Sequence, residues 1–160
     1  MAVDMFIKIE GVDGESKDKT HTDEIDVLAW SWGMSQSGSF HVGGGGGAGK
    51  ANFQDLSLTK YIDKATPLLM LRCATGEHIP EATLVVRKAG TEQQEYFNIK
   101  IEKLMVTSVS TGGSGGEDRL TENVTLNFAK VHVGYFPQKD DGSLDAEKEF
   151  NYDIEANAVP

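Results

Sequence analysis

A glycine-rich segment, GGGGGAGKA at residues 43–51, comes nearest in this sequence to a nucleotide-binding motif. Gly44, four further residues, then Gly49 and Lys50 fit the phosphate-loop pattern G-x-x-x-x-G-K, but Ala51 stands where Ser or Thr should bind magnesium. Such a loop also needs a buried strand before it and a helix after it, whereas here polar residues precede it and strand-like residues follow. The run matches the dinucleotide pattern G-x-G-x-x-G as well, which any glycine run does. We therefore interpret the segment as a long loop in which glycine permits positive φ angles.

A second glycine-rich segment, GGSGG at residues 112–116, matches the nucleophile-elbow pattern G-x-S-x-G around Ser114. That motif requires a helix immediately after the serine turn, and the following EDRLTENVTLNF is typical of a strand. The segment is better interpreted as a turn between two long strands. The neighbouring Glu117, Asp118 and Arg119 suit either an ion-pair site between subunits or a solvated loop.

The histidine and cysteine residues, which could bind a metal or act as nucleophiles, show no arrangement typical of a metal site or a catalytic site. The four histidines are far apart in the sequence and lack metal-ligand spacing, so we expect no zinc site: His21, His41, His78 and His132. The single cysteine, Cys73, lies in the apolar stretch LLMLRCA and is interpreted as a small core residue. We expect no catalytic residue, no cofactor and no bound metal.

The composition excludes several partners. The 160 residues suit one domain, and Asp plus Glu exceed Lys plus Arg by 25 to 15, a net charge of −10. Without a basic patch, such a chain repels nucleic acid and anionic membrane surfaces. The first residues carry charges and form no secretory signal, and no apolar run is long enough to span a membrane. We expect the chain to be made and folded in the cytoplasm, so that export would require machinery that accepts the folded form.

Alternation of apolar and polar residues, with a period of two, dominates the sequence and predicts a mostly β protein. The predicted strands cover residues 3–9, 24–34, 50–58, 81–88, 95–109, 122–136 and 148–155. In the two longest, the apolar phase shifts midway, which indicates a bulge near Glu102–Lys103 in the first of them. Long strands bent in this way favour a bent-strand β-barrel of two sheets.

The strand predicted at 24–34 has two unlike faces. Leu28, Trp30, Trp32 and Met34 would point into the core, and the opposite face ends in small residues such as Ser31.

One segment, KATPLLMLRCATGEH, predicts a helix packed on the side of the barrel. Thr66 suits the N-cap, Pro67 the first helical position and Gly76 the C-terminal end. The run from Leu68 to Leu71 is too apolar for an exposed face, so we expect it to pack on the barrel.

Three stretches together resemble the Hcp (haemolysin-coregulated protein) family of bacterial type VI secretion. They are the aromatic block AWSWGMSQSG, the glycine run with the following KANFQDLSLTKYIDKATPLLMLRCATGEH, and the block STGGSGGEDRLTENVTLNF. They occur in this order, and the similarity runs from residue 1 to about residue 138. The tail KDDGSLDAEKEFNYDIEANAVP is less diagnostic.

The resemblance implies a β-barrel of two sheets with one helix on its side, which closes with five other copies into a homohexameric ring. Stacked rings would form the inner tube of a contractile device, with a contractile sheath around it and a VgrG-type spike at its end. The tube would carry small effector proteins in its lumen and would be secreted without a cleaved signal peptide. No catalytic activity is implied, and the chain ends too soon for a fused toxin domain.

With this resemblance, the glycine-rich segments become candidate contacts between subunits or rings. The first set is Gly43, Gly44, Gly45, Gly46, Gly47, Ala48, Gly49 and Lys50. The second set is Gly112, Gly113, Ser114, Gly115, Gly116, Glu117 and Asp118. Ser31 is the candidate lumen residue. Loops on a free surface, and Ser31 in the barrel core, remain the alternatives.

Two other function classes remain open at this stage. One is an enzyme that uses the first glycine loop for a nucleotide, and the other is a monomeric ligand-binding β-barrel.

Overall fold

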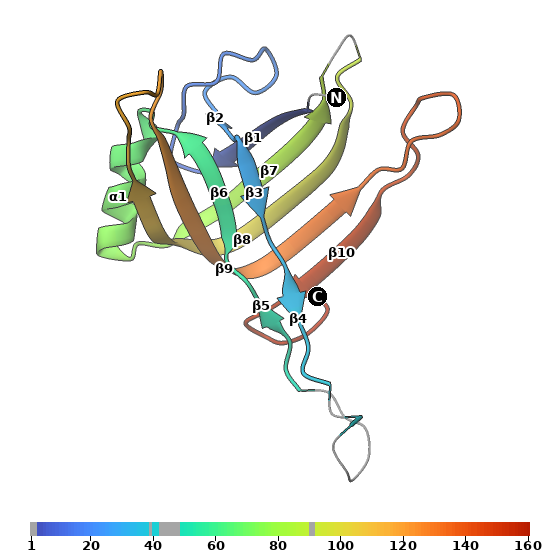
Figure 1. Cartoon of the computed structure of the whole chain (residues 1–160). Helices are drawn as coiled ribbons and strands as arrows, with labels where there is room; N and C mark the ends of the chain where they lie inside the picture. The colour runs from blue at the N-terminus through green and yellow to red at the C-terminus, as the bar shows by residue number, and fades with distance from the viewer. Residues whose placement is uncertain (1–2, 39, 42–48, 90–91) are drawn as a thin grey trace.

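A curled antiparallel sheet makes up most of the protein in the computed structural model, which describes residues 3–38, 40–41, 49–89 and 92–160 (Figure 1). The strands are β1 (Val3–Ile9), β2 (Ile25–Asp26), β3 (Ala29–Ser31), β4 (Met34–Ser35), β5 (Asn52–Phe53), β6 (Leu56–Tyr61), β7 (Ile79–Lys88), β8 (Glu95–Thr111), β9 (Thr121–Tyr135) and β10 (Lys148–Asp153). The main sheet has the order β2-β1-β7-β8-β9-β6-β3, with β10 added alongside β9, and β4 and β5 form a second small sheet. The predicted class, mostly β with bent strands and one helix, is confirmed.

The long strands β8 and β9 pair along nearly their whole length and give the sheet its curl. Ile99 and Ile101 of β8 face the core, and beyond Lys103 the buried residues are Leu104 and Val106. Lys103 itself has a left-handed backbone, with φ at 53°. The alternation of buried and exposed residues therefore shifts by one residue at the position predicted from the sequence. The shift in register with β9 comes a few residues later, between Val106 and Ser108.

The segment predicted as one strand over 24–34 is three short strands. Its first part, β2, pairs with β1, and its second part, β3, pairs with β6, so the segment joins two strands from opposite ends of the sheet order. The backbone N–H of Leu28 donates to the carbonyl of Thr59 at 2.8 Å where the change of partner takes place.

This change of partner reverses the faces of the segment, and the predicted orientation is wrong for its first half. Ile25 and Val27 are buried in the core, while Leu28 is 39% exposed. Beyond the reversal, Trp30 and Trp32 pack partly against the core, as predicted. A single alternation cannot describe a strand that turns over between two partners.

The helix α1 (Ala65–Thr75) lies against the outside of the curled sheet, at the edge of the molecule in Figure 1. The predicted N-cap at Thr66 and first helical position at Pro67 are wrong, because the helix begins two residues earlier, at Ala65. Asp63, just before the cap residue Lys64, bonds to the first turn: its carboxylate accepts the N–H of Ala65 at 3.0 Å, and its own N–H donates to Oγ1 of Thr66 at 3.1 Å. Gly76 ends the helix in the left-handed conformation, with φ at 69°, as predicted.

A buried charged cluster lies beneath the start of the helix. Lys60 and Glu122 are both buried and form an ion pair across β6 and β9. The Lys60 ammonium also donates to Asp63 at 2.9 Å, and Thr66 donates to the Glu122 carboxylate at 2.6 Å. The cluster therefore ties α1 to two strands of the barrel.

The core fills the inside of the curl and consists mainly of aliphatic residues from β1, β2, β6, β7, β8, β9 and α1. Its fully buried members include Ile7, Ile25, Leu56, Leu69, Ile79, Leu84, Ile101 and Leu126. Among the described residues, α1 is the only helix, and it is too short to cross a membrane.

Candidate functional site: surfaces for assembly

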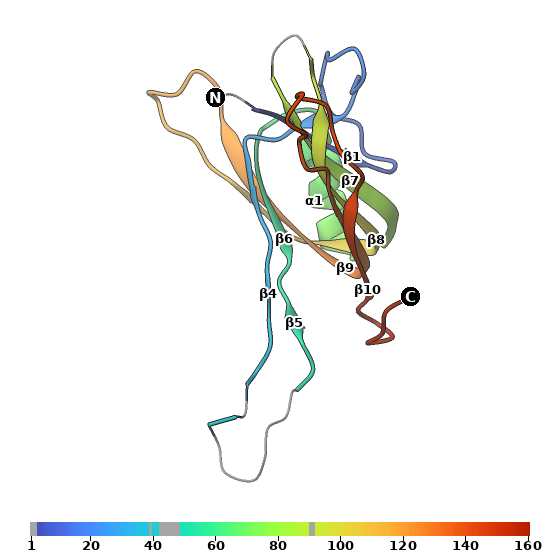
Figure 2. The ribbon, with the colours of Figure 1, turned by 90° about the vertical axis from the view of Figure 1, so that its right-hand side faces the viewer.

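The strands β4 and β5 form the base of an arm that projects away from the barrel (Figures 1 and 2). Aromatic residues fix this base: the indole N–H of Trp32 donates to the carbonyl of Gln54 at 2.9 Å, and its ring stacks on Phe53. Phe53 in turn stacks on Tyr152 of β10, with ring centroids 5.3 Å apart. The direction of the arm is thus set by packing against the barrel.

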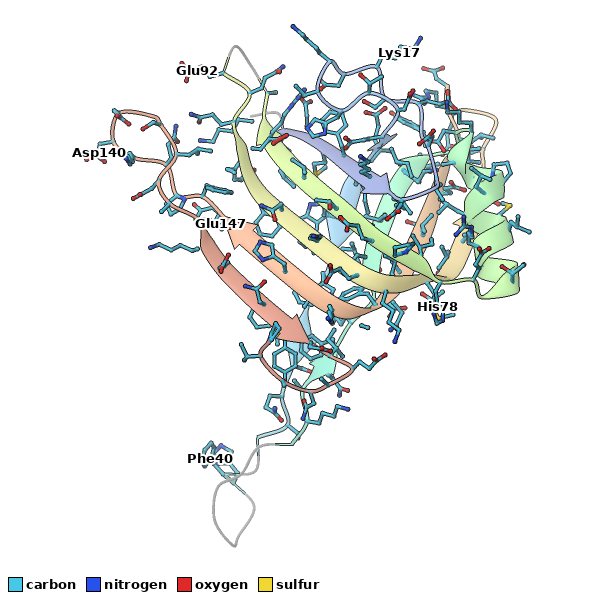
Figure 3. The ribbon with its side chains drawn as sticks, turned by 180° about the vertical axis from the view of Figure 1, so that it is seen from behind. Lys17, Phe40, His78, Glu92, Asp140 and Glu147 are labelled. Atoms are coloured by element: carbon cyan, nitrogen blue, oxygen red, sulfur yellow. The ribbon has the colours of Figure 1, made fainter. Side chains whose placement is uncertain are left out.

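Beyond its base, the arm exposes large apolar side chains. Phe40 lies at its far end and is 81% exposed, and Met34 of β4 is 47% exposed (Figure 3). A phenylalanine held away from its own core costs free energy in water unless another surface covers it. The arm is therefore suited to contact a neighbouring molecule.

The described part of the first glycine-rich segment belongs to this arm. Gly49 and Lys50 are exposed, and a Cβ at Gly49 would approach Oγ of Ser37 to 2.8 Å, so glycine permits the two legs of the arm to lie close together. Residues 43–48 lie outside the described part of the chain. The segment after Lys50 leads into strand β5, where a phosphate loop would require a helix.

The second glycine-rich segment is an exposed turn between β8 and β9. All residues from Gly112 to Asp118 are exposed, and the N–H of Glu117 donates to the carbonyl of Ser114 at 3.1 Å. Strand β9 follows, so Ser114 is not in a nucleophile elbow. Figures 1 and 2 both place this turn at the opposite end of the molecule from the arm. The described Gly49 and Lys50 therefore do not share a site with the 112–118 turn, and the role of both glycine-rich segments in assembly stays a prediction.

Charged and aromatic groups flank the 112–118 turn. The Arg119 guanidinium lies 3.7 Å from the centre of the Tyr61 ring, which is a close cation–π contact, and Leu120 beside it is 45% exposed. Burial raises the pKa of Asp26, at the same surface, above its usual range, and the nearby Arg119 charge opposes that rise. This end of the molecule thus combines an apolar side chain with groups able to form ion pairs.

Ser31, the candidate lumen residue, is exposed on the outward face of the sheet and does not lie in the core. Across the strands it is followed by Ser57 of β6 and Thr125 of β9. The Thr125 hydroxyl bonds to those of Thr107 and Ser108 at 2.7 and 2.6 Å. The face around Ser31 therefore carries several short hydroxyl-bearing side chains, and the Asp55 carboxylate accepts from the Thr107 hydroxyl at 2.7 Å.

The expectation that the whole apolar run of the helix packs on the barrel is wrong. Leu69 is buried, but Leu68, Met70 and Leu71 are 41%, 42% and 56% exposed. The helix contacts the barrel along one stripe, four residues apart, through Ala65, Leu69 and the partly buried Cys73. The other face of the helix is apolar and uncovered, and it is a third candidate contact surface. The four consecutive apolar residues LLML could have indicated it, because one stripe of a helix cannot bury all of them.

Comparison with known proteins gives one consistent result. Residues 6–135 match the profile of the family described as "Type VI secretion system effector, Hcp". Protein hcp1 of Pseudomonas aeruginosa is 67% identical over 146 residues, which cover 91% of this chain and 90% of that protein. The crystal structure of Hcp1 from Salmonella typhimurium is similar with a TM-score of 0.79 and 37% identity, covering 99% of both chains. A structure described as a type six secretion system protein has a TM-score of 0.92 and 28% identity, covering 98% of this chain and 99% of that one.

Proposed function

The chain belongs to the Hcp family of type VI secretion, a family of structural and secreted proteins and not of enzymes, and from this premise we propose that it is the subunit of the secretion tube. Six copies close into a ring, and rings stack into a tube that sheath contraction propels. The subunit is made in the cytoplasm and leaves the cell through the type VI system.

The observation that carries this proposal is the arm that exposes Phe40 far from the barrel. A ring closes through a heterologous contact, in which two different patches of each subunit meet. The chain offers unlike surfaces for such a contact: the aromatic arm, the uncovered helix face at Leu68 and Leu71, and the sheet edges. Burying the Phe40 side chain on a neighbour would supply the apolar free energy that its own fold leaves unused.

Stacking of rings needs a further contact between the two ring faces, and the two glycine-rich segments are our candidates for contacts between subunits or rings. The arm that carries Gly49 and Lys50 lies at the opposite end of the subunit from the 112–118 turn, as a head-to-tail stack requires. Lys50, exposed on the arm, can pair with an acidic group of a neighbour such as Glu117 or Asp118. An exposed pair of this kind contributes under about 1 kcal/mol, which suits a tube that must come apart after firing.

The outer and end surfaces of the tube would bind the other parts of the device. We assign the contractile sheath to the outside of the tube and a VgrG-type spike to its end.

We assign the hydroxyl-bearing face around Ser31 to the lumen, where it contacts small effector proteins. Short side chains keep the pore wide, so a longer side chain should obstruct cargo without affecting the ring. Ser31→Gln is expected to reduce co-purification of an effector while the assembled mass stays the same. Ser143→Gln, at an exposed position in the loop between β9 and β10, is the matched control. Unchanged cargo retention in Ser31→Gln would remove Ser31 from the lumen.

Native mass spectrometry of the purified chain tests the ring. The proposal predicts a species with six times the mass of the 17.4 kDa chain. A monomer at high concentration would overturn it and favour a ligand-binding barrel. A thermal shift with ATP and magnesium would instead favour a nucleotide-dependent enzyme.

A further inference from the structure

A histidine and two glutamates come together on the outward face of β9 and β10, although the sequence predicted no metal site. His132, Glu147 and Glu149 each offer one ligand atom, and these atoms all lie within 4.8 Å of one another. Antiparallel pairing of β10 with β9 brings them together: Asn151 pairs with His132, and Glu149 pairs with Gly134. We propose that this cluster is a site for one Zn²⁺ ion, with His132, Glu147 and Glu149 as its protein ligands.

The hydrogen bonding of His132 leaves the correct nitrogen free for a metal. Its Nδ1 lies 2.7 Å from the amide oxygen of Asn151, which can only accept, so Nδ1 carries the proton. In the neutral ring the lone pair is then on Nε2, which faces Oε2 of Glu147 at 3.4 Å. Metal-binding histidines commonly donate their second ring N–H to an oxygen in this way.

The spacing of the ligand atoms fits a tetrahedral ion. Two atoms that each lie about 2.1 Å from a tetrahedral zinc are separated by roughly 3.4 Å. The 3.4 Å between Nε2 of His132 and Oε2 of Glu147 is the same separation, and it is long for a direct hydrogen bond. Glu149 is exposed, so its side chain can rotate to complete the set of three protein ligands.

The backbone beneath the cluster is shaped to admit the Glu147 carboxylate. A Cβ at Gly134 would overlap Oε2 of Glu147, so the carboxylate reaches His132 only because residue 134 is glycine. The side-chain N–H of Asn98, across the sheet on β8, donates to the same oxygen at 3.4 Å. Both Glu147 and His132 are about three-quarters shielded from solvent.

The ammonium of Lys100 of β8, which pairs with His132 across the strands, is directed away from the cluster. It lies 3.8 Å from Glu81 and 3.9 Å from Glu102. It therefore leaves the negative charge of Glu147 and Glu149 available to an ion.

Isothermal titration of tag-free, chelator-treated protein with zinc chloride tests the site. The wild-type chain is expected to bind one ion per chain, and His132→Gln to bind at least about tenfold more weakly. Gly134→Ala keeps every ligand but displaces Glu147, so it should weaken binding to a similar degree. His78→Gln, which removes an exposed histidine away from Glu147 (Figure 3), should change nothing.

Circular dichroism of each variant shows whether it is folded, and Gly134→Ala decides the question if His132→Gln does not fold. The proposal is overturned if the wild-type chain shows no saturable uptake. It is equally overturned if the folded ligand-site variants bind like the wild type, or if His78→Gln loses as much affinity as they do.

Discussion

Truncation of Phe40, at the end of the arm, should weaken ring assembly and leave the free energy of unfolding of the single chain nearly unchanged. It is 81% exposed in the single chain, so Phe40→Ala should change the free energy of unfolding by less than about 0.5 kcal/mol. A phenylalanine side chain buries about 150–200 Å² when covered, and four-fifths of that area at about 25 cal/mol per Å² corresponds to roughly 3–4 kcal/mol. Fixing the side chain in one conformation costs about 1 kcal/mol, so Phe40 should stabilise each contact between subunits by about 2–3 kcal/mol.

Light scattering after size-exclusion chromatography, over a dilution series, measures this effect. A loss of about 2 kcal/mol weakens each contact roughly 30-fold, so Phe40→Ala rings should dissociate at concentrations where wild-type rings stay intact. Val159→Ala is the matched control, because Val159 is 76% exposed but lies near the C-terminus. If Phe40→Ala and the wild type dissociate at the same concentration, the arm does not bury Phe40 on a neighbour and the reasoning is refuted.

Three further perturbations test other parts of the account. Lys50→Glu, which reverses an exposed charge on the arm, should slow tube formation measured by turbidity and leave the unfolding midpoint unchanged. Glu122→Gln removes the buried partner of Lys60 and should lower the free energy of unfolding by about 3 kcal/mol, measured by urea titration. The Arg87 guanidinium holds the pKa of Asp18 well below its usual range, so this pair stabilises the fold above the ordinary aspartate pKa of about 3.9. Its contribution is lost as the pH falls below that value, and the loss of stability between pH 5 and pH 3 should be smaller in Asp18→Asn.

The substitutions at Lys50, Glu122 and Asp18 are each tested against a control variant or a result that would contradict them. Lys139→Glu reverses an exposed lysine in another loop, and equal slowing by both changes would remove Lys50 from the contact. Lys103→Gln breaks an exposed pair with Glu155 and should cost under about 1 kcal/mol; a similar cost for Glu122→Gln would mean that the buried cluster stabilises little. An unchanged acid dependence in Asp18→Asn would contradict the assigned role of its ion pair with Arg87.

The sequence predicted the β class, the single helix and most strand positions, because alternation of apolar residues marks strands with one face in the core. It failed where a segment changes partner. The 24–34 segment turns over between β1 and β6, so Ile25 and Val27 are buried and Leu28 is exposed, the reverse of the expected pattern. Periodicity records which face of a strand is buried and carries no information on a segment that turns over between two partner strands.

The surfaces were harder to predict than the fold. The apolar residues of the helix looked like core residues, yet Leu68 and Leu71 are exposed, because hydrophobicity alone does not distinguish a core from a contact with another molecule. The His132 cluster was missed for a different reason: Glu147 and Glu149 reach the histidine through strand pairing, and their spacing in the chain shows no ligand pattern. The glycine-rich segments are easily recognised as loops in the sequence. Glycine indicates only which backbone conformations are permitted there, and it does not indicate which molecule the loop contacts.

Projection images of the purified, untagged chain by electron microscopy test the central claim most directly. The account predicts closed six-fold rings with an open centre. Compact single particles without a pore would contradict it at a protein concentration of about 100 μM, where a contact worth about 5.5 kcal/mol is half formed.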